Sequence, residues 1–241
     1  MEIGKAVKRP FGDVKILAIG LAISTISAIG IYAAIASLLA SPLLALLIGV
    51  LVFLIPEFIL TGYMLEVAKA SAKKNYKPMP WKGFGGLLKR GFGAMVIGII
   101  YGILILLLGA LFLGPAILQL IAGGLGATPD PALFISLGLG LIALLLVAIA
   151  IGYFIPAAYV SYAVSGKFKE GFALRIIGKK ALSGDYFVAV LIGSIYMVAI
   201  TLLFSLVFFL FPPLGAGISA FIGRVAFYTL VGEAWAKVRV K

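Results

Sequence analysis

Cysteine and histidine are both absent from this chain of 241 residues, and asparagine and glutamine occur once each, as Asn75 and Gln119. Without cysteine the chain has no disulfide or thiolate chemistry. Without histidine it lacks the commonest general base and the usual zinc and haem ligands. We therefore expect no metal and no cofactor. Because amide side chains are thermolabile, their scarcity is also typical of proteins from a thermophile.

Charged residues are scarce as well. They make up 12% of the chain, whereas hydrophobic residues make up 63% and the mean hydropathy is +1.23. In soluble proteins about a quarter of the residues are charged. A water-soluble fold of this length could not bury so much apolar surface, and no polar region is long enough to form a soluble domain. The composition predicts a single integral membrane domain over residues 1–241, in the cell membrane.

Six apolar runs each exceed the roughly 20 residues that a helix needs to cross a hydrocarbon layer of ~30 Å. They cover residues 16–39, 42–67, 92–121, 131–164, 186–211 and 213–236. Backbone groups in lipid must pair within the protein, and the alternating strands of a membrane barrel are not seen. The sequence therefore predicts an all-α, multi-pass protein with six transmembrane helices.

Nearly all of the 20 lysines and arginines lie in four segments. These segments precede the first run, separate the second from the third and the fourth from the fifth, and follow the sixth. Positively charged loops stay on the cytoplasmic side, so both termini are predicted to be cytoplasmic. Topology thus accounts for the net charge of +12, and we expect no nucleic-acid partner, because phosphate binding needs an exposed basic face.

Internal similarity indicates three repeats. Pro56 and Pro156 both follow isoleucine inside the second and fourth runs, and a Gly-Asp pair ending in Asp13 or Asp185 precedes the first and fifth runs. The simplest unit is a basic cytoplasmic segment followed by two helices, giving parallel repeats over 1–69, 70–165 and 166–236. Chance likeness between apolar helices is the alternative.

Two of the basic links also carry aromatic residues. Phe168, Phe172 and Ile176 recur at helical spacing, with most of the nearby lysines on other faces. This pattern is typical of an amphipathic helix in the membrane interface, with its cations near anionic lipid headgroups. Trp81 and Phe84 suggest the same for the earlier link, although neighbouring glycines weaken a helix there. A solvated loop is the alternative in both places.

Two charged residues fall deep inside apolar runs, Glu57 in the second and Arg224 in the sixth. Each lies about a dozen residues, or roughly 18 Å of helix, before the basic end of its run. A lone charge at that depth costs about 2.5–3.5 kcal/mol on insertion scales, so the sequence predicts an intramembrane ion pair. The pair could line a polar pathway, or it could clamp the first and last hairpins together, which we favour.

Motifs for catalysis are missing. No two acidic residues share helical i, i+3 or i+4 spacing at membrane depth, and there is no phosphate-binding loop, serine-nucleophile elbow or intramembrane metal motif. We therefore expect a non-enzymatic protein without catalytic residues.

Several motifs together resemble a known family, the largely archaeal membrane proteins catalogued as domain of unknown function 4013. The likeness spans almost the whole chain, and it is carried by Thr61-Gly-Tyr-Met-Leu-Glu-Val-Ala-Lys69, Trp81-Lys-Gly-Phe84, Gly98-Ile-Ile-Tyr101, Gly166-Lys-Phe-Lys-Glu-Gly-Phe172 and Gly184-Asp-Tyr186. The resemblance implies the six-helix topology and an archaeal membrane, and it implies no activity.

Taken together, these features predict a membrane scaffold or assembly component with a basic cytoplasmic face, surrounded by the lipid bilayer. The alternative is a small channel or transporter whose polar path runs past Glu57 and Arg224. The 30 glycines permit close helix contacts, so the sequence is compatible with a homo-oligomer.

Overall fold

The structure is a computed structural model that describes residues 1–123 and 131–238. Helices make up 87% of it, and no strand occurs in the described part of the chain. The predicted loop at 122–130 lies, beyond its first two residues, outside the described residues, as do residues 239–241. The predicted all-α class is therefore confirmed.

Within the described residues, six helices are long and apolar enough to cross a membrane, as the sequence predicts. They are α2 (Val14–Ser37), the rod Pro42–Ala72, α5 (Phe84–Gly123), α6 (Pro131–Ser165), α8 (Gly184–Val207) and α9 (Pro212–Lys237). Shorter helices join them: α1 (Ile3–Lys8), the 3₁₀ turn η1 (Arg9–Phe11), the 3₁₀ helix η3 (Phe168–Phe172) and α7 (Leu174–Ala181).

Polar caps fix where several spanning helices begin. Asp13 accepts a hydrogen bond from the backbone N–H of Ile16 (2.9 Å), which caps α2. Ser41 and Ser183 cap the rod and α8 in the same way. Each cap satisfies an N–H group that has no partner inside its helix.

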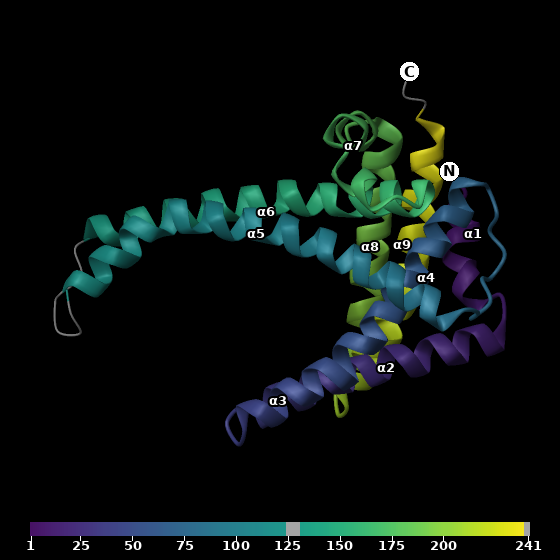
Figure 1. The fold of residues 1–241 in the computed structure, drawn as a ribbon, viewed down its shortest axis with the longest axis horizontal. Coiled ribbons are helices and arrows are strands. Elements are labelled where there is room, and N and C mark those ends of the chain that lie inside the picture. Colours follow the sequence, from purple (N-terminus) through teal and green to yellow (C-terminus); the bar gives the residue numbers. More distant parts are fainter. Residues whose placement is uncertain (124–130, 239–241) are drawn as a thin grey trace. The chain divides into compact units, whose positions relative to one another are not determined.

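The rod Pro42–Ala72 changes its winding near its middle. It consists of α3 (Pro42–Ile48), a π-helical stretch η2 (Gly49–Leu54) and α4 (Ile55–Ala72). Pro56 has no N–H to donate and its ring crowds the preceding turn, which explains the wider winding just before it. There the rod lies against α2, because a Cβ at Gly30 would come within 2.6 Å of the Val52 backbone. Figure 1 shows the rod as one continuous ribbon.

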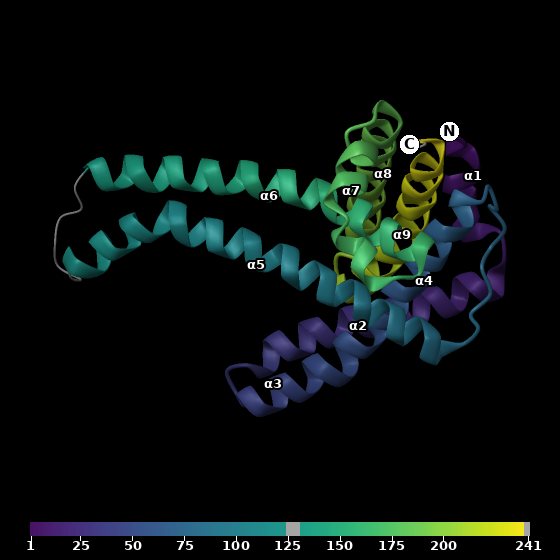
Figure 2. The same cartoon turned by 45° about the horizontal axis from the view of Figure 1, so that its top comes forward.

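The chain divides into two compact units, one of residues 1–95 and 156–241 and one of residues 96–155. The smaller unit holds most of α5 and the first part of α6, which run side by side (Figure 2). Their backbones are close, since a Cβ at Gly140 would lie 2.8 Å from the carbonyl oxygen of Phe112. The expectation of one membrane domain over 1–241 stays a prediction.

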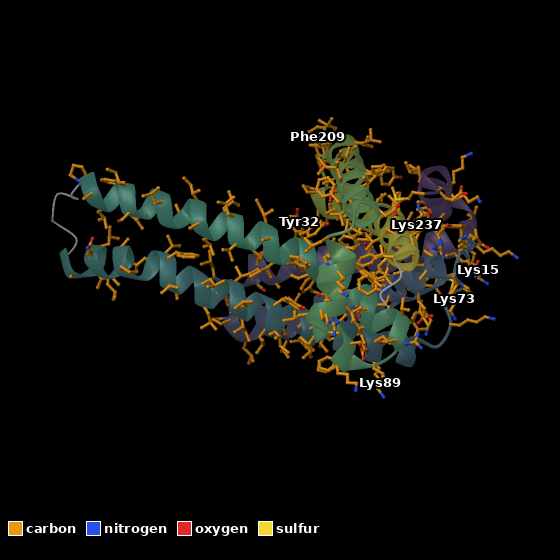
Figure 3. The ribbon with its side chains drawn as sticks, turned by 90° about the horizontal axis from the view of Figure 1, so that it is seen from above. Lys15, Tyr32, Lys73, Lys89, Phe209 and Lys237 are labelled. Carbon is orange, nitrogen blue, oxygen red and sulfur yellow. The ribbon has the colours of Figure 1, made fainter. Side chains whose placement is uncertain are left out.

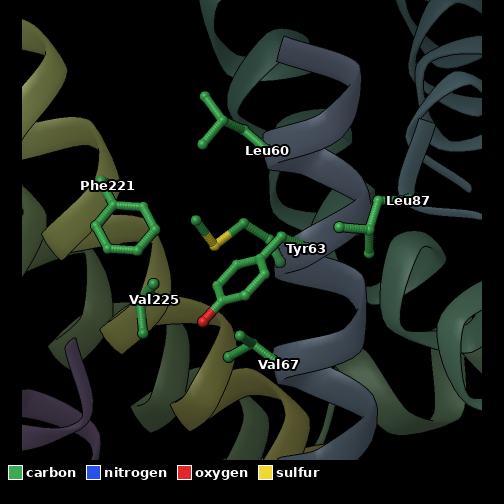
Figure 4. Close-up of a cluster of buried hydrophobic side chains, with 7 residues drawn as sticks. Leu60, Tyr63, Val67, Leu87, Phe221 and Val225 are labelled. Carbon is green, nitrogen blue, oxygen red and sulfur yellow. The ribbon is translucent and has the colours of Figure 1, made fainter. Parts of the chain in front are cut away.

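In the larger unit, α9 forms the centre and packs against α8, α4 and α2. Of its most apolar stretch 67% is buried, against 22% in α2. Leu60, Tyr63 and Val67 of α4 face Phe221 and Val225 of α9 in its core (Figure 4). The backbones of α4 and α9 approach each other closely at glycine, since a Cβ at Gly232 of α9 would lie 2.3 Å from the carbonyl oxygen of Ala68 in α4. Small residues therefore set the α4–α9 distance.

The link after α6 differs from the amphipathic helix that the sequence suggests. Phe168 and Phe172 lie in η3 and Ile176 lies in α7, and Ala173 (ψ 68°) interrupts the helix between them. The tighter 3₁₀ turn also rotates residues four apart off a common face. The three side chains therefore do not form one stripe, and the buried positions in α7 are Ile177 and Ala181. An interfacial location of this link stays a prediction.

Candidate functional site

Glu57 and Arg224 contact each other in the larger unit. Arg224 Nη1 donates a hydrogen bond to Glu57 Oε1, and the hydroxyl of Ser27 on α2 donates to the other carboxylate oxygen at 3.4 Å. The pair thus joins three helices. The side chains are 24% (Glu57) and 32% (Arg224) exposed in the protein alone, so the pair is accessible as well as bonded.

Both members of the pair sit midway along their helices. Glu57 lies 15 residues from either end of the span Pro42–Ala72, and Arg224 lies 12 and 13 residues from the ends of α9. At 1.5 Å per residue each charge is about 20 Å from the nearer polar end. The pair therefore lies at mid-length of two apolar helices that are long enough to cross a membrane.

A cavity of about 420 Å³ opens beside the pair. Besides Glu57 and Arg224, its walls carry four hydroxyl groups and three apolar side chains: Thr61, Tyr159, Ser194, Tyr228, Met64, Met197 and Phe227. These residues come from α4, α6, α8 and α9, and all belong to the larger unit. Concave sites of this volume, with a few polar groups among apolar ones, are typical of small-molecule binding.

The opposite faces of α4 and α9 carry a second set of charges. Glu66 follows Glu57 by nine residues in α4, and Glu233 follows Arg224 by nine residues in α9. Nine residues make two and a half helical turns, so each later carboxylate points to the opposite side of its helix. Glu66 pairs with Arg90 in the first turns of α5. Glu233 accepts hydrogen bonds from the backbone N–H of Glu2 at 2.9 and 3.2 Å. The central pair and these outer carboxylates are therefore separate sites.

The basic end of the larger unit holds a second cavity, of about 540 Å³. Arg9 lies next to it and is only 4% exposed. Its Nη1 donates to Ser71 Oγ (2.6 Å), Thr229 Oγ1 (3.1 Å) and the carbonyl oxygen of Val67 (3.3 Å). Burial lowers the pKa of Arg9 to about 10, and the nearby Tyr63 offsets part of that shift. Figure 3 shows Lys15, Lys73 and Lys89 extending outward, as expected of solvated cations.

Sequence reasoning missed the burial of Arg9. In the sequence Arg9 is one cation of a basic terminal segment, and nothing in the hydropathy pattern separates it from Lys8. A weak signal is the choice of arginine, since its fork of five donors suits several acceptors at once.

The aromatic residues of the earlier link pack against the protein, and their location in the membrane interface stays a prediction. Trp81 stacks on Tyr63 at 4.0 Å between ring centres, and its Nε1 donates to the carbonyl oxygen of Ile16 at 2.9 Å. Phe84 begins α5 and stacks on Trp81 at 6.3 Å. Trp81 thus packs against the core cluster, while Phe84 remains exposed.

Carboxylates in the described residues do not gather into a metal site: no group of three or more potential ligands occurs there. Six apolar helices and a bonded charge pair midway through two of them define a polytopic helical membrane protein.

The family follows from a comparison of sequences. Residues 43–209 match the family described as "Protein of unknown function (DUF4013)". The chain belongs to this family, which confirms the resemblance seen in its motifs.

One archaeal protein is related to the chain in sequence. The chain is 27% identical over 180 residues to a protein of Methanocaldococcus jannaschii named "Uncharacterized protein MJ1189". The match covers 72% of this chain and 58% of that relative, so the chain spans little more than half of the relative's length. No solved structure matches the chain.

Proposed function

We propose that this protein is a small, non-enzymatic solute transporter whose substrate site is the cavity beside Glu57 and Arg224. The observation that carries the proposal is the position of that cavity, with its ion pair and hydroxyl groups, midway along the helices. Transporters commonly bind their substrates near the midplane of the bilayer. A purely structural clamp would need the charges but not the space beside them.

The lining favours a small zwitterion as the solute. Glu57 offers a carboxylate to a cationic group, and Arg224 offers a guanidinium to an anionic group. A ligand that carries both charges can bond to both residues, and its zero net charge limits the cost of leaving water. Met64, Met197 and Phe227 supply apolar contacts for a short side chain.

A membrane scaffold is the second candidate. The pair holds α4 against α9 and reaches α2 through Ser27, which is the geometry that a clamp between hairpins requires. Under this proposal the basic links face the cytoplasm and engage anionic lipids or partner proteins.

We also infer that the helices form three parallel repeats with both termini cytoplasmic. The supporting observation is that α4 and α9 share one arrangement. Each has a charge at mid-depth (Glu57 or Arg224) and a carboxylate nine residues later on the opposite face (Glu66 or Glu233). Repeated helices would place their charged groups alike.

Binding of zwitterions to the purified chain in detergent tests the transporter. We expect at least one of the twenty common amino acids or glycine betaine to raise the thermal unfolding temperature saturably. Ser194→Phe places a bulky ring in the cavity and should weaken that binding at least about tenfold. The neighbouring Ile195→Phe lies outside the cavity and should leave the binding unchanged.

Uptake in proteoliposomes separates the two candidates. A radiolabelled amino acid that binds should also accumulate inside vesicles of the wild type, and not inside those of Ser194→Phe. Binding without uptake would favour the scaffold. Absence of binding by every probe, or equal binding by Ser194→Phe, would overturn the substrate site.

A further inference from the structure

The cavity at the basic end of the larger unit has the groups of an anion site. Lysines reach it from three separate parts of the chain: Lys5 on α1, Lys74 just after α4 and Lys237 at the end of α9. Two carboxylates, Glu2 and Glu233, also line it. It lies on the face of α9 opposite the central pair, so it is independent of the proposed solute site.

The carboxylates of this cavity are already engaged. Both carboxylate oxygens of Glu233 accept a hydrogen bond from the Glu2 backbone N–H. The Glu2 carboxylate lies 3.5 Å from the ammonium of Lys5. Lys237 pairs with Asp185 at 3.1 Å, outside the cavity. Among the described residues, no ion-pair partner lies within 4 Å of Lys74.

Arg9 adds a buried positive charge behind one wall. It bonds to the buried hydroxyl of Ser71, a residue of the cavity wall. Its Nε and Nη2 atoms are buried and have no hydrogen-bond partner within the described part of the chain. All three acceptors of its Nη1 are uncharged oxygens. A guanidinium removed from water without a carboxylate is costly, and a negative charge in the adjoining cavity would offset that cost.

The position of the cavity suits a phosphate group. Its walls come from the ends of α4 and α9, where the apolar spans give way to lysines. That is the level of lipid headgroups in a bilayer, and cations there attract anionic lipids. Lysine ammonium groups form short, charge-assisted hydrogen bonds to phosphate oxygens.

We propose that this cavity binds a phosphate group through the ammonium groups of Lys74 and Lys5, with the field of Arg9 behind them. Two sources share that chemistry, the headgroup of an anionic phospholipid and free inorganic phosphate. In the first case the site would hold a lipid at the surface of the protein, and in the second it would sense a soluble ion.

The backbone conformation at Lys74 allows a substitution that removes the ammonium group without straining the fold. Its φ is +57°, the left-handed conformation in which a helix C-terminus favours glycine. Lys74→Gly therefore removes the ammonium while relieving the backbone, so the variant is expected to fold. Lys73→Gln is the matched control for Lys74→Gln, because Lys73 is the adjacent exposed lysine and does not line the cavity.

Inorganic phosphate is the first probe, added to the full chain in a neutral detergent at constant ionic strength set with chloride. We expect a saturable rise in unfolding temperature with phosphate and not with chloride. Lys74→Gln and Lys74→Gly should weaken the apparent affinity about ten- to a hundredfold, the loss expected for one charge-assisted hydrogen bond. Lys73→Gln should bind like the wild type.

Dioctanoyl phosphatidylglycerol is the second probe, with dioctanoyl phosphatidylcholine as its neutral counterpart in the same micelles. Saturation by phosphatidylglycerol that competes with phosphate identifies a lipid headgroup site, and a response to phosphate alone identifies free phosphate. A chain that responds to neither probe overturns the proposal. An equal loss in Lys73→Gln and Lys74→Gln overturns it too, because the effect would then be general surface charge.

Discussion

A charged side chain in the middle of a membrane helix must bond to the protein, draw in water or reach the surface. Arg224 is too deep for its side chain to reach the surface, and it bonds to Glu57 instead. Ser27 adds a hydrogen bond to the same carboxylate. This pair could be predicted from the sequence because equal depth on two helices and opposite charge are both readable there. The cavity beside it could not, because it depends on which side chains leave space.

Removal of one member of the pair should destabilise the protein. Glu57→Gln or Arg224→Met leaves a charge without its partner, and the loss expected for a buried pair is about 3 kcal/mol. The double substitution should recover much of that loss, since no lone charge remains. Thermal unfolding of the four proteins in detergent measures the coupling.

A charge exchange gives an independent control. Glu57→Arg combined with Arg224→Glu should keep most of the stability if the pair acts as a clamp, while zwitterion binding changes. Simple addition of the two single effects in the double variant would show that the residues are not coupled.

Helices in the larger unit approach each other through glycine. A Cβ on Gly91 of α5 would lie 1.8 Å from the carbonyl oxygen of Phe58, and one on Gly62 would lie 2.0 Å from that of Leu87. The backbones of α4 and α5 thus touch over more than one turn. Because apolar side chains already have a good solvent in lipid, such close packing replaces the hydrophobic effect as the force between helices.

Alanine at Gly91 should therefore separate α4 from the start of α5. The added methyl group overlaps a backbone atom that cannot move alone, so we expect a loss of about 2 kcal/mol or more. A Cβ on Gly102 in the same helix would meet no atom of another described part of the chain within 4 Å, so Gly102→Ala should be neutral or stabilising through its helix propensity. Unfolding temperatures of both variants test this, and equal effects would contradict the contact.

Elements differed in how well the sequence predicted them. The six spanning helices follow from hydropathy alone, because lipid accepts only long apolar segments with all backbone groups paired. In the link after α6, periodicity predicts which residues share a face only while the helix continues, and it does not reveal the interruption at Ala173. Trp81 is suited to an interface by composition, but its hydrogen bond to Ile16 depends on tertiary contacts.

At the scale of the whole molecule, the predicted orientation can be tested by labelling. The chain has no cysteine, so a single introduced cysteine reports its own side of the membrane. Lys77→Cys and Lys169→Cys lie at exposed positions in the two basic links, and Leu39→Cys is exposed just beyond the opposite end of α2.

Basic residues on the cytoplasmic side predict the labelling pattern. Cysteine at Lys77 or Lys169 should react with an impermeant maleimide only after the cells are opened, and cysteine at Leu39 should react in intact cells. Labelling of the Lys77 variant in intact cells would reverse the orientation. Labelling of Lys77 and Lys169 from different sides would contradict the six-helix topology itself.

The central place of α9 has a consequence for synthesis. A ribosome completes α9 after the other five spanning helices, yet α9 is the most buried of the six and the least apolar, with a mean hydropathy of 1.5 against 2.1–2.9 for the rest. Until Arg224 emerges, Glu57 has no counter-charge within the bilayer. Nascent chains that stop short of α9 would expose an unpaired carboxylate, and the faces of α8, α4 and α2 that α9 covers, to the machinery that removes misassembled membrane proteins. Entry of α9 from the translocon would then be helped by its place between α8 and α4, because its own apolarity is weaker than theirs.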